Sequence, residues 1–157
     1  MKKKKNIGVV AHDNRKKDII EWASFNWKEL AQHNLVCTGT TGKLIEETLR
    51  QRCEEHETVP PTVIRLKSGP LGGDQQLGAL ICEGKIDMLI FFWDPMQPQP
   101  HDVDVKALLR ITVLYNIPTA SNRSTADFMV SSELFHEEYD PILKDYGGYI
   151  SRDVNMD

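Results

Sequence analysis

The sequence has no long hydrophobic run, no excess of positive charge and few cysteines, and each of these features excludes a class of protein. No apolar stretch approaches the roughly 20 residues that cross a bilayer, so we expect no membrane partner. The formal net charge of −4 gives no support for nucleic-acid binding. Residues 1–5 are expected to be a solvated basic tail, because the apolar run at residues 7–11 is too short for a signal peptide. Together these features favour a cytoplasmic protein.

The three cysteines, Cys37, Cys53 and Cys82, have no spacing typical of metal ligands, and any disulfide pairing would leave one thiol over. We expect them to be reduced and to act as small apolar residues on buried faces. The sequence therefore predicts neither a disulfide framework nor a structural metal.

The chain of 157 residues, 40% of them hydrophobic, is long enough for one domain with a full core. Short apolar runs alternate along it with stretches of helical periodicity, which predicts a parallel sheet with right-handed crossovers and helices on both faces. The expected strands are residues 7–11, 35–37, 63–66, 88–93 and 117–120. The expected helices cover residues 19–31, 44–53, 77–81 and 105–113, and a fifth begins near Ala126.

Several residues are expected to mark the ends of these elements. Gly84 suits the end of the third helix, and Asp102 and Ser124 suit the caps of the fourth and fifth. Pro118 is typical of an edge strand. Residues 54–61 read as an exposed connection, and residues 147–157 as a flexible C-terminal tail with a hinge at its two glycines.

The most informative segment is Lys-Ser-Gly-Pro-Leu-Gly-Gly-Asp-Gln-Gln at residues 67–76. Its glycines let the backbone approach a ligand closely, and Asp74 stands at the start of the helix that follows. The segment can hold an anion and place a base beside it. A tight turn with a helix-capping aspartate explains the same residues equally well.

Three other polar loops also follow apolar runs, at residues 12–16, 38–42 and 94–104. In a parallel sheet such loops all emerge at the carboxyl edge, where ligands bind. Thr-Gly-Thr-Thr-Gly at residues 38–42 offers hydroxyls and free backbone N–H groups, which suit phosphate. Neither this loop nor Ser68-Gly69 matches a nucleotide fingerprint, so a small sugar phosphate fits better. Ordinary Thr-rich and Gly-rich turns remain the alternative for either loop alone.

Four further side chains can take part in proton transfer at that edge. His12 and His101 follow strand ends, where an imidazole can polarise a carbonyl or shuttle a proton. Asp74 and Asp104 lie near helix starts, where capping explains them as well as catalysis does. His12, Asp13, His101 and Asp104 could also ligate a metal, but no local motif supports a metal site. The other histidines, His33, His56 and His136, are expected to be surface residues without a function.

These segments, read together, resemble the methylglyoxal synthase family. The resemblance is carried by His12-Asp13 with Lys16, by residues 38–42, by residues 68–76 and by Phe-Phe-Trp-Asp-Pro at residues 91–95 leading to His-Asp-Val-Asp-Val-Lys-Ala-Leu at residues 101–108. It covers about residues 7–146. It implies a three-layer α/β/α fold with a five-stranded parallel sheet in the order 3-2-1-4-5, and commonly a homohexamer. It also implies the conversion of dihydroxyacetone phosphate to methylglyoxal and inorganic phosphate without a metal or organic cofactor, with phosphate as product and inhibitor.

The resemblance further implies a role for each matching residue. Asp74 is the base at the hydroxyl-bearing carbon, and His101 is the electrophile and proton relay at the oxygens. Asp104 is an auxiliary acid without a fixed role. The residues expected to hold the substrate and its phosphate are Lys16, Thr38, Gly39, Thr40, Thr41, Ser68 and Gly69, with His12 in the same pocket.

Two features depart from the family pattern, and two alternative functions stay open. The segment between Thr41 and Ser68 is longer than expected, and Arg152 is the nearest candidate for a phosphate-contacting arginine near the C-terminus. One alternative is a non-catalytic binding module, like the regulatory domain of carbamoyl phosphate synthetase, which shares the fold. The other is a different lyase or isomerase acting on a related phosphate ester.

Overall fold

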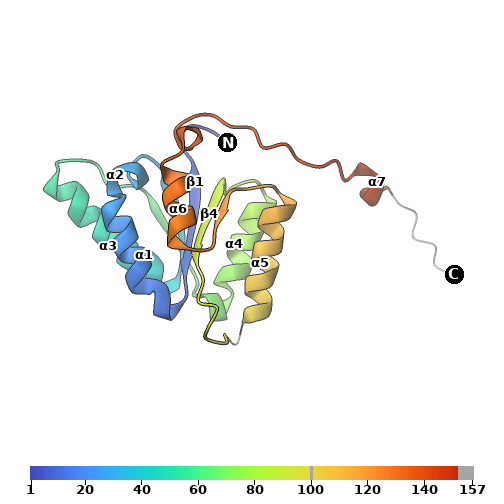
Figure 1. Cartoon of the computed structure of the whole chain (residues 1–157), viewed down its shortest axis with the longest axis horizontal. Helices are drawn as coiled ribbons and strands as arrows, with labels where there is room; N and C mark the ends of the chain where they lie inside the picture. Colours follow the sequence, from blue (N-terminus) through green and yellow to red (C-terminus); the bar gives the residue numbers. More distant parts are fainter. Residues whose placement is uncertain (100, 152–157) are drawn as a thin grey trace.

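A computed structural model describes residues 1–99 and 101–151, and the sheet at its centre has the predicted topology (Figure 1). The five parallel strands are β1 (Asn6–Ala11), β2 (Asn34–Thr38), β3 (Val63–Leu66), β4 (Met88–Phe92) and β5 (Thr119–Ala120). Their order is β3-β2-β1-β4-β5. This confirms the three-layer fold class and the edge position of β5, which is shorter than predicted because its pairing with β4 starts only after Pro118.

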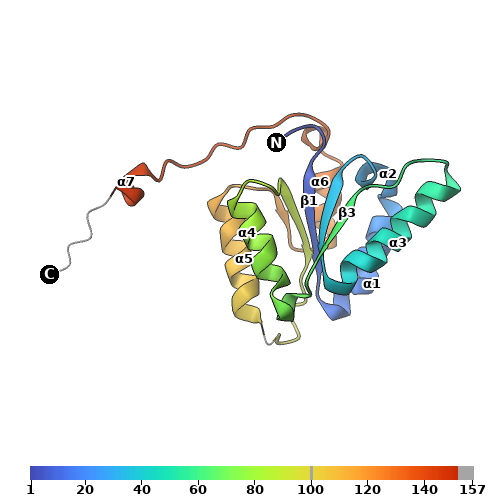
Figure 2. The same cartoon turned by 180° about the vertical axis from the view of Figure 1, so that it is seen from behind.

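Helices cover both faces of the sheet (Figures 1 and 2). One face carries α1 (Lys16–Phe25), α2 (Trp27–Leu30), α3 (Gly39–Glu55) and α6 (Arg123–Val130); the other carries α4 (Gly73–Cys82) and α5 (Asp102–Leu114). Side chains of the central strands alternate between the two cores. In β4, Met88, Ile90 and Phe92 face the first core, and Leu89 and Phe91 face the second.

Several predicted element ends move by a few residues. The helix expected over residues 19–31 is two helices that meet at Asn26. The N-cap of α6 is Asn122, whose side chain accepts a hydrogen bond from the Thr125 N–H, and Ser124 lies inside the helix. Asp102 is the first residue of α5 and makes no cap. Gly84, with φ +66°, follows α4 as expected.

The N-terminal end of the molecule corrects two predictions. Lys5 is fully buried, and its Nζ donates to the backbone oxygens of Lys2 and Glu137, at 3.2 and 2.8 Å. His33 is also buried, and its Nδ1 accepts from the backbone N–H of Lys5 at 3.2 Å. The predictions of a solvated lysine and a surface histidine were wrong there. Phe135 of η3 (Glu133–Phe135) packs edge-on against His33, and the Glu137 carbonyl oxygen that follows accepts from Lys5.

The remaining departures concern single side chains. Cys37 and Cys53 are buried as expected, but Cys82 is exposed, because it lies one residue past Ile81 and so turns away from the core. Residues 54–61 are mostly exposed, although the first two belong to α3 and His56 stacks on Trp27 with ring centroids 4.7 Å apart. Within the described residues, no helix is long and apolar enough to cross a bilayer.

Residues 139–151, here called the C-terminal arm, extend away from the body of the molecule (Figure 1). The arm is without regular structure up to the short helix α7 (Gly147–Ile150), which occupies the expected glycine hinge. It leaves the body beside the N-terminus, where Met1 and Tyr139 exchange backbone hydrogen bonds. Arg152, the candidate arginine, lies outside the described residues.

Candidate active site

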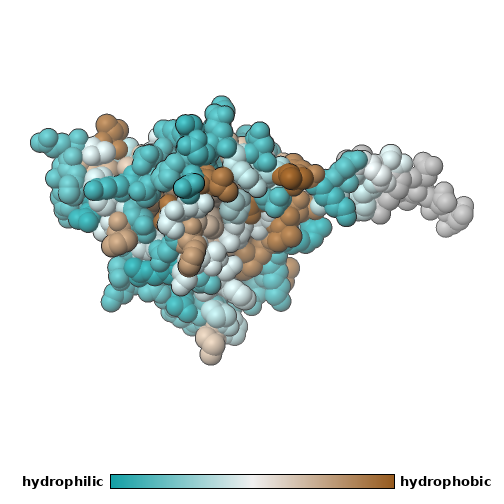
Figure 3. Space-filling model, turned by 45° about the horizontal axis from the view of Figure 1, so that its top comes forward, coloured by the Kyte–Doolittle hydropathy of each residue, from teal (hydrophilic) through white to brown (hydrophobic). Residues whose placement is uncertain are grey.

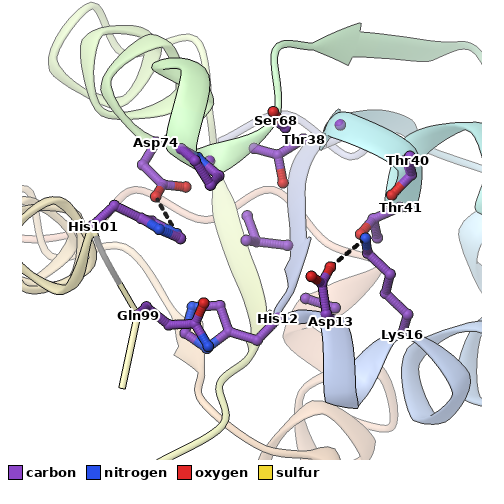
Figure 4. Close-up of a pocket in the computed structure, with 15 residues that line it drawn as sticks. His12, Asp13, Lys16, Thr38, Thr40, Thr41, Ser68, Asp74, Gln99 and His101 are labelled. Atoms are coloured by element: carbon purple, nitrogen blue, oxygen red, sulfur yellow. Dashed lines mark hydrogen bonds and ion pairs between the residues drawn. The ribbon is translucent and has the colours of Figure 1, made fainter. Parts of the chain in front are cut away.

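The loops that follow β1, β2, β3 and β4 enclose one pocket at the carboxyl edge of the sheet (Figure 4). It is lined by Val10, Ala11, His12, Asp13, Lys16, Thr38, Gly39, Thr40, Thr41, Ser68, Gly69, Pro70, Asp74, Gln99 and His101. Of the residues singled out from the sequence, all but Asp104 lie on this lining. Residues more than eighty positions apart therefore converge, as the parallel topology requires.

Asp74 reaches the pocket because the loop before α4 is compressed by glycines. The loop forms the short helix η2 (Gly69–Leu71), turns at Gly72 with φ +95° and enters α4 at Gly73. A Cβ on Gly73 would lie 2.0 Å from the Lys67 carbonyl oxygen, so only glycine allows this turn. The turn directs the Asp74 side chain inward, where the residue is only 3% exposed.

Asp74 and His101 form a buried pair, with Oδ2 and Nε2 3.5 Å apart. Gly69 lies directly against both groups, since a Cβ there would meet Nε2 at 2.9 Å and Oδ2 at 3.0 Å. Burial raises the pKa of Asp74; the nearby His101 opposes this and Asp104 adds to it. A carboxylate with a raised pKa is a stronger proton acceptor, and the absence of a side chain at Gly69 lets its loop pack closely against the pair.

His12, at the end of β1, is held as a neutral hydrogen-bond donor. Its Nδ1 accepts from the backbone N–H of Asp94 at 3.2 Å, so the neutral ring carries its hydrogen on Nε2. Burial, followed by the charge of His101, lowers the pKa of His12. Nε2 is buried and has no hydrogen-bond partner among the described residues. The ring stands edge-on to that of His101 with centroids 5.9 Å apart.

The opposite side of the pocket has the features of a phosphate cradle. The N-terminus of α3 presents the backbone N–H groups and hydroxyls of its first turn, and Thr38 and Thr41 are buried. Gly39 adopts φ +50°, and a Cβ on it would lie 2.9 Å from the Ser68 Cα, so the loops after β2 and β3 touch there. Gly39 also donates its N–H to the Lys67 carbonyl oxygen at 3.1 Å.

Lys16 adds a cation to the cradle. Its Nζ lies 2.6 Å from Oδ1 of Asp13, and its side chain extends toward Thr41 (Figure 4). The hydrogen bond and charge of Lys16 lower the pKa of Asp13, so this carboxylate stays ionised. Because Asp13 is exposed, the ammonium group can exchange this partner for an anion in the pocket.

Asp104 is the one predicted residue that the structure places elsewhere. It lies in the first turn of α5 and borders a small cavity between α4 and α5. Asp74 lines both this small cavity and the main pocket. Asp104 therefore acts on Asp74 through its charge and does not face the main pocket.

Sequence reasoning considered Asp13 only as a possible metal ligand, and it did not single out Gln99. The pairing of Asp13 with Lys16 could have been found, because a spacing of three positions lets two side chains pair on a helical turn. Gln99 lies in a Pro-rich segment without periodicity, so no pattern pointed to it. No group of three or more potential metal ligands occurs within the part of the chain that the structure describes.

A buried carboxylate and imidazole beside an anion cradle define the class: an α/β enzyme site for proton transfer on a small phosphate ester. Residues 18–121 match the family model described as "MGS-like domain". The methylglyoxal synthase of Maridesulfovibrio salexigens is 60% identical over 97% of this chain and 99% of its own. That of Oleidesulfovibrio alaskensis is 55% identical over 97% of each chain.

A solved structure agrees with these relatives. The crystal structure of methylglyoxal synthase from Elizabethkingia anophelis NUHP1 matches with a TM-score of 0.88 and 46% identity, over 100% of this chain and 97% of that one. The chain therefore belongs to the methylglyoxal synthase family.

Proposed function

We propose that the protein is a lyase that converts dihydroxyacetone phosphate to methylglyoxal and inorganic phosphate. The observation that carries the proposal is the buried pair of Asp74 and His101, 3.5 Å apart, in one pocket with the cradle of Lys16 and the α3 N-terminus. A binding module needs the cradle but has no use for a buried base with a raised pKa.

The first step is removal of a proton from the hydroxyl-bearing carbon by the Asp74 carboxylate. The electron pair left behind forms an enediolate whose charge lies on the former carbonyl oxygen, which must be met by donors already in place. The Nε2–H of His12 is such a donor, because Nδ1 is held by the Asp94 N–H. His101, beside Asp74, is the second.

The second step expels phosphate. A proton passes from the hydroxyl oxygen to the former carbonyl oxygen with His101 as relay, so that negative charge now lies on the terminal oxygen. That oxygen re-forms a C=O bond, the double bond shifts by one position, and the C–O bond to phosphate breaks. The released enol takes up a proton on its terminal carbon and loses the proton of its hydroxyl group, and so becomes methylglyoxal.

Geometry decides between this elimination and isomerisation of the same intermediate. Expulsion requires the C–O bond to phosphate to stand perpendicular to the plane of the enediolate, where its electrons overlap the π system. A cradle on the wall opposite Asp74 and His101 can hold the phosphate out of that plane (Figure 4). The leaving dianion is stabilised there by the helix N-terminus and Lys16.

Incubation of the protein with dihydroxyacetone phosphate, with separate assays for methylglyoxal and phosphate, tests the proposal. Equal amounts of both products support it. An isomerase would produce glyceraldehyde 3-phosphate and no free phosphate, and a regulatory module of the carbamoyl phosphate synthetase type would bind phosphate and release nothing.

The proposal extends to assembly, regulation and location. Exposed apolar residues on the C-terminal arm, including Ile142 at 86% exposure, support a homo-oligomer, and the family resemblance suggests a hexamer. Hydrophobic surface is visible where the arm leaves the body of the molecule (Figure 3). Light scattering after gel filtration tests the assembly.

Inorganic phosphate, as a product that occupies the cradle, is proposed to inhibit competitively with substrate. A cytoplasmic location follows from the substrate, which is an intermediate of glycolysis.

A further inference from the structure

Gln99 lines the pocket on the side of the reacting groups. It lies in the segment between β4 and α5, two positions before His101, and it lines the same pocket as His12 and His101 (Figure 4). Its side chain is half-buried, whereas Pro95, Met96, Gln97 and Pro98 before it are exposed. The phosphate cradle lies on the other side of the pocket, so Gln99 faces the part of a substrate that carries no phosphate.

The segment that carries Gln99 is tied to the loop after β1. Asn14 Nδ2 donates to Asp94 Oδ2 at 2.9 Å and to Gln97 Oε1 at 2.5 Å. Asp94 is itself buried, accepts the Met96 N–H at 3.0 Å through Oδ1 and donates its own N–H to His12. We call these hydrogen bonds between Asn14, Asp94 and Gln97 the clasp. The clasp joins the segment before Gln99 to the loop after β1, and its member Asp94 also holds His12.

Local hydrogen bonds also set the direction of the Gln99 side chain. The side-chain Nε2 of Gln99 donates to the backbone carbonyl oxygen of Gln97 at 3.3 Å. The backbone carbonyl oxygen of Gln99 accepts the Asp102 N–H at 3.2 Å. Oε1 is thereby left to accept a hydrogen bond, and within the described residues it has no donor. A half-buried amide oxygen that faces a pocket and is without a partner is suited to a ligand hydroxyl.

The substrate assigned above has one hydroxyl, on the carbon that loses the proton. During the first step Asp74 is occupied by the C–H bond, and His12 and His101 both present donors to the carbonyl oxygen. In the proposed mechanism His101 takes the hydroxyl proton only in the second step, so it does not hold this hydroxyl while the carbon loses its proton. We propose that Gln99 accepts a hydrogen bond from this hydroxyl and thereby orients the carbon, so that one of its two hydrogens, and not the other, points at Asp74. Gln99 is then a substrate-contacting residue that sets the stereospecificity of proton abstraction; the inference rests on the proposed function.

The test is a Gln99→Met variant, which keeps the length of the side chain and removes its hydrogen bonding. We expect kcat/KM to fall about 10-fold, the effect of one neutral hydrogen bond. Recovered substrate from deuterated water should carry deuterium at both positions of the hydroxymethyl carbon, whereas the parent labels one. Inhibition by inorganic phosphate should stay within about 2-fold of the parent, because the cradle is untouched.

Two matched variants separate contact from structure. Gln99→Glu keeps an acceptor at the same distance and should keep labelling at one position, even where its charge slows turnover. Met96 lies on the same segment and is 85% exposed, so Met96→Ala should match the parent in every measurement. An active parent with a Gln99→Met variant of parental rate and stereospecificity overturns this inference alone. A parent that releases no methylglyoxal overturns the proposed function, and this inference with it.

Discussion

Replacing Gly69 with alanine tests whether the spacing of Asp74 and His101 matters for turnover. The added Cβ would lie 2.9 Å from His101 Nε2 and 3.0 Å from Asp74 Oδ2, where ordinary contact begins at 3.4 Å. Each group must therefore move by about half an ångström. The backbone accepts alanine, since Gly69 is not among the residues with positive φ. The substitution thus adds a methyl group to the reaction site without straining the loop.

The expected effect is a selective loss of turnover. Misplacement of reacting groups by about 1 Å can cost roughly 100-fold in rate, so we expect kcat to fall about 10- to 100-fold. Steady-state kinetics with dihydroxyacetone phosphate measures it, and calorimetry should show a melting temperature close to that of the parent. Inhibition by phosphate should persist, because the Gly69 N–H remains.

Gly78 supplies the matched control. It lies inside α4, and a Cβ there would have no atom within 4 Å. Gly78→Ala should leave kcat unchanged and stabilise the fold by about 0.5 to 1 kcal/mol through helix propensity. If Gly69→Ala is as active as Gly78→Ala, the close packing around Asp74 and His101 has no part in catalysis.

Three other predictions address the base, the cradle and the opposite end of the molecule. Asp74→Asn should lower kcat by at least about 10² to 10⁴, abolish exchange of the carbon-bound hydrogen in deuterated water and still bind a phosphate-bearing enediolate mimic; near-parental exchange would assign the base to another residue. Lys16→Ala and Thr41→Ala should each weaken binding of substrate and phosphate together by about 1.5 to 3 kcal/mol, and unchanged phosphate affinity by calorimetric titration would contradict the cradle. Burial lowers the pKa of His33 in the folded protein to about 4, whereas the ordinary pKa of histidine is near 6.5. Between these two pH values the unfolded chain therefore binds a proton on His33 that the folded chain does not. The free energy of unfolding should therefore fall by roughly 3 kcal/mol as the pH is lowered from 6.5 to 4. Asn in place of His33 keeps an acceptor for the Lys5 backbone N–H, so urea unfolding of His33→Asn should not show this pH-dependent loss.

The strands and the clustering of the loops could be predicted because they depend on local pattern. Residues 88–92 form an unbroken apolar run, which a sheet covered on both faces requires, and parallel topology then brings the polar residues after each strand together. The residues around Thr38 and Ser68 could be named as a possible phosphate site because hydroxyl and glycine residues suit an anion. None of this needed knowledge of distant contacts.

What could not be predicted depends on partners far away in the chain. The burial of Lys5 depends on the Glu137 carbonyl oxygen, which is supplied 132 residues later. Asp104 was grouped with the catalytic residues because it lies near a helix start and matches the family motif. It does not line the main pocket, and it shares only the small cavity between α4 and α5 with Asp74. Gln99 gave no signal, because its position depends on the hydrogen bonds around Asn14 and on no periodicity.

The hydrogen bond from the Asp94 N–H to His12 makes two chemically identical imidazoles inequivalent. Within the described residues no backbone group holds either ring nitrogen of His101, so in the proposed mechanism it can both give and receive a proton, whereas His12 can take one only by leaving its main-chain partner. Because the donor is a backbone group, every residue at position 94 except proline preserves it. The proposed difference in role between the two histidines therefore depends on the main chain, and it can survive substitutions that would remove a side-chain partner.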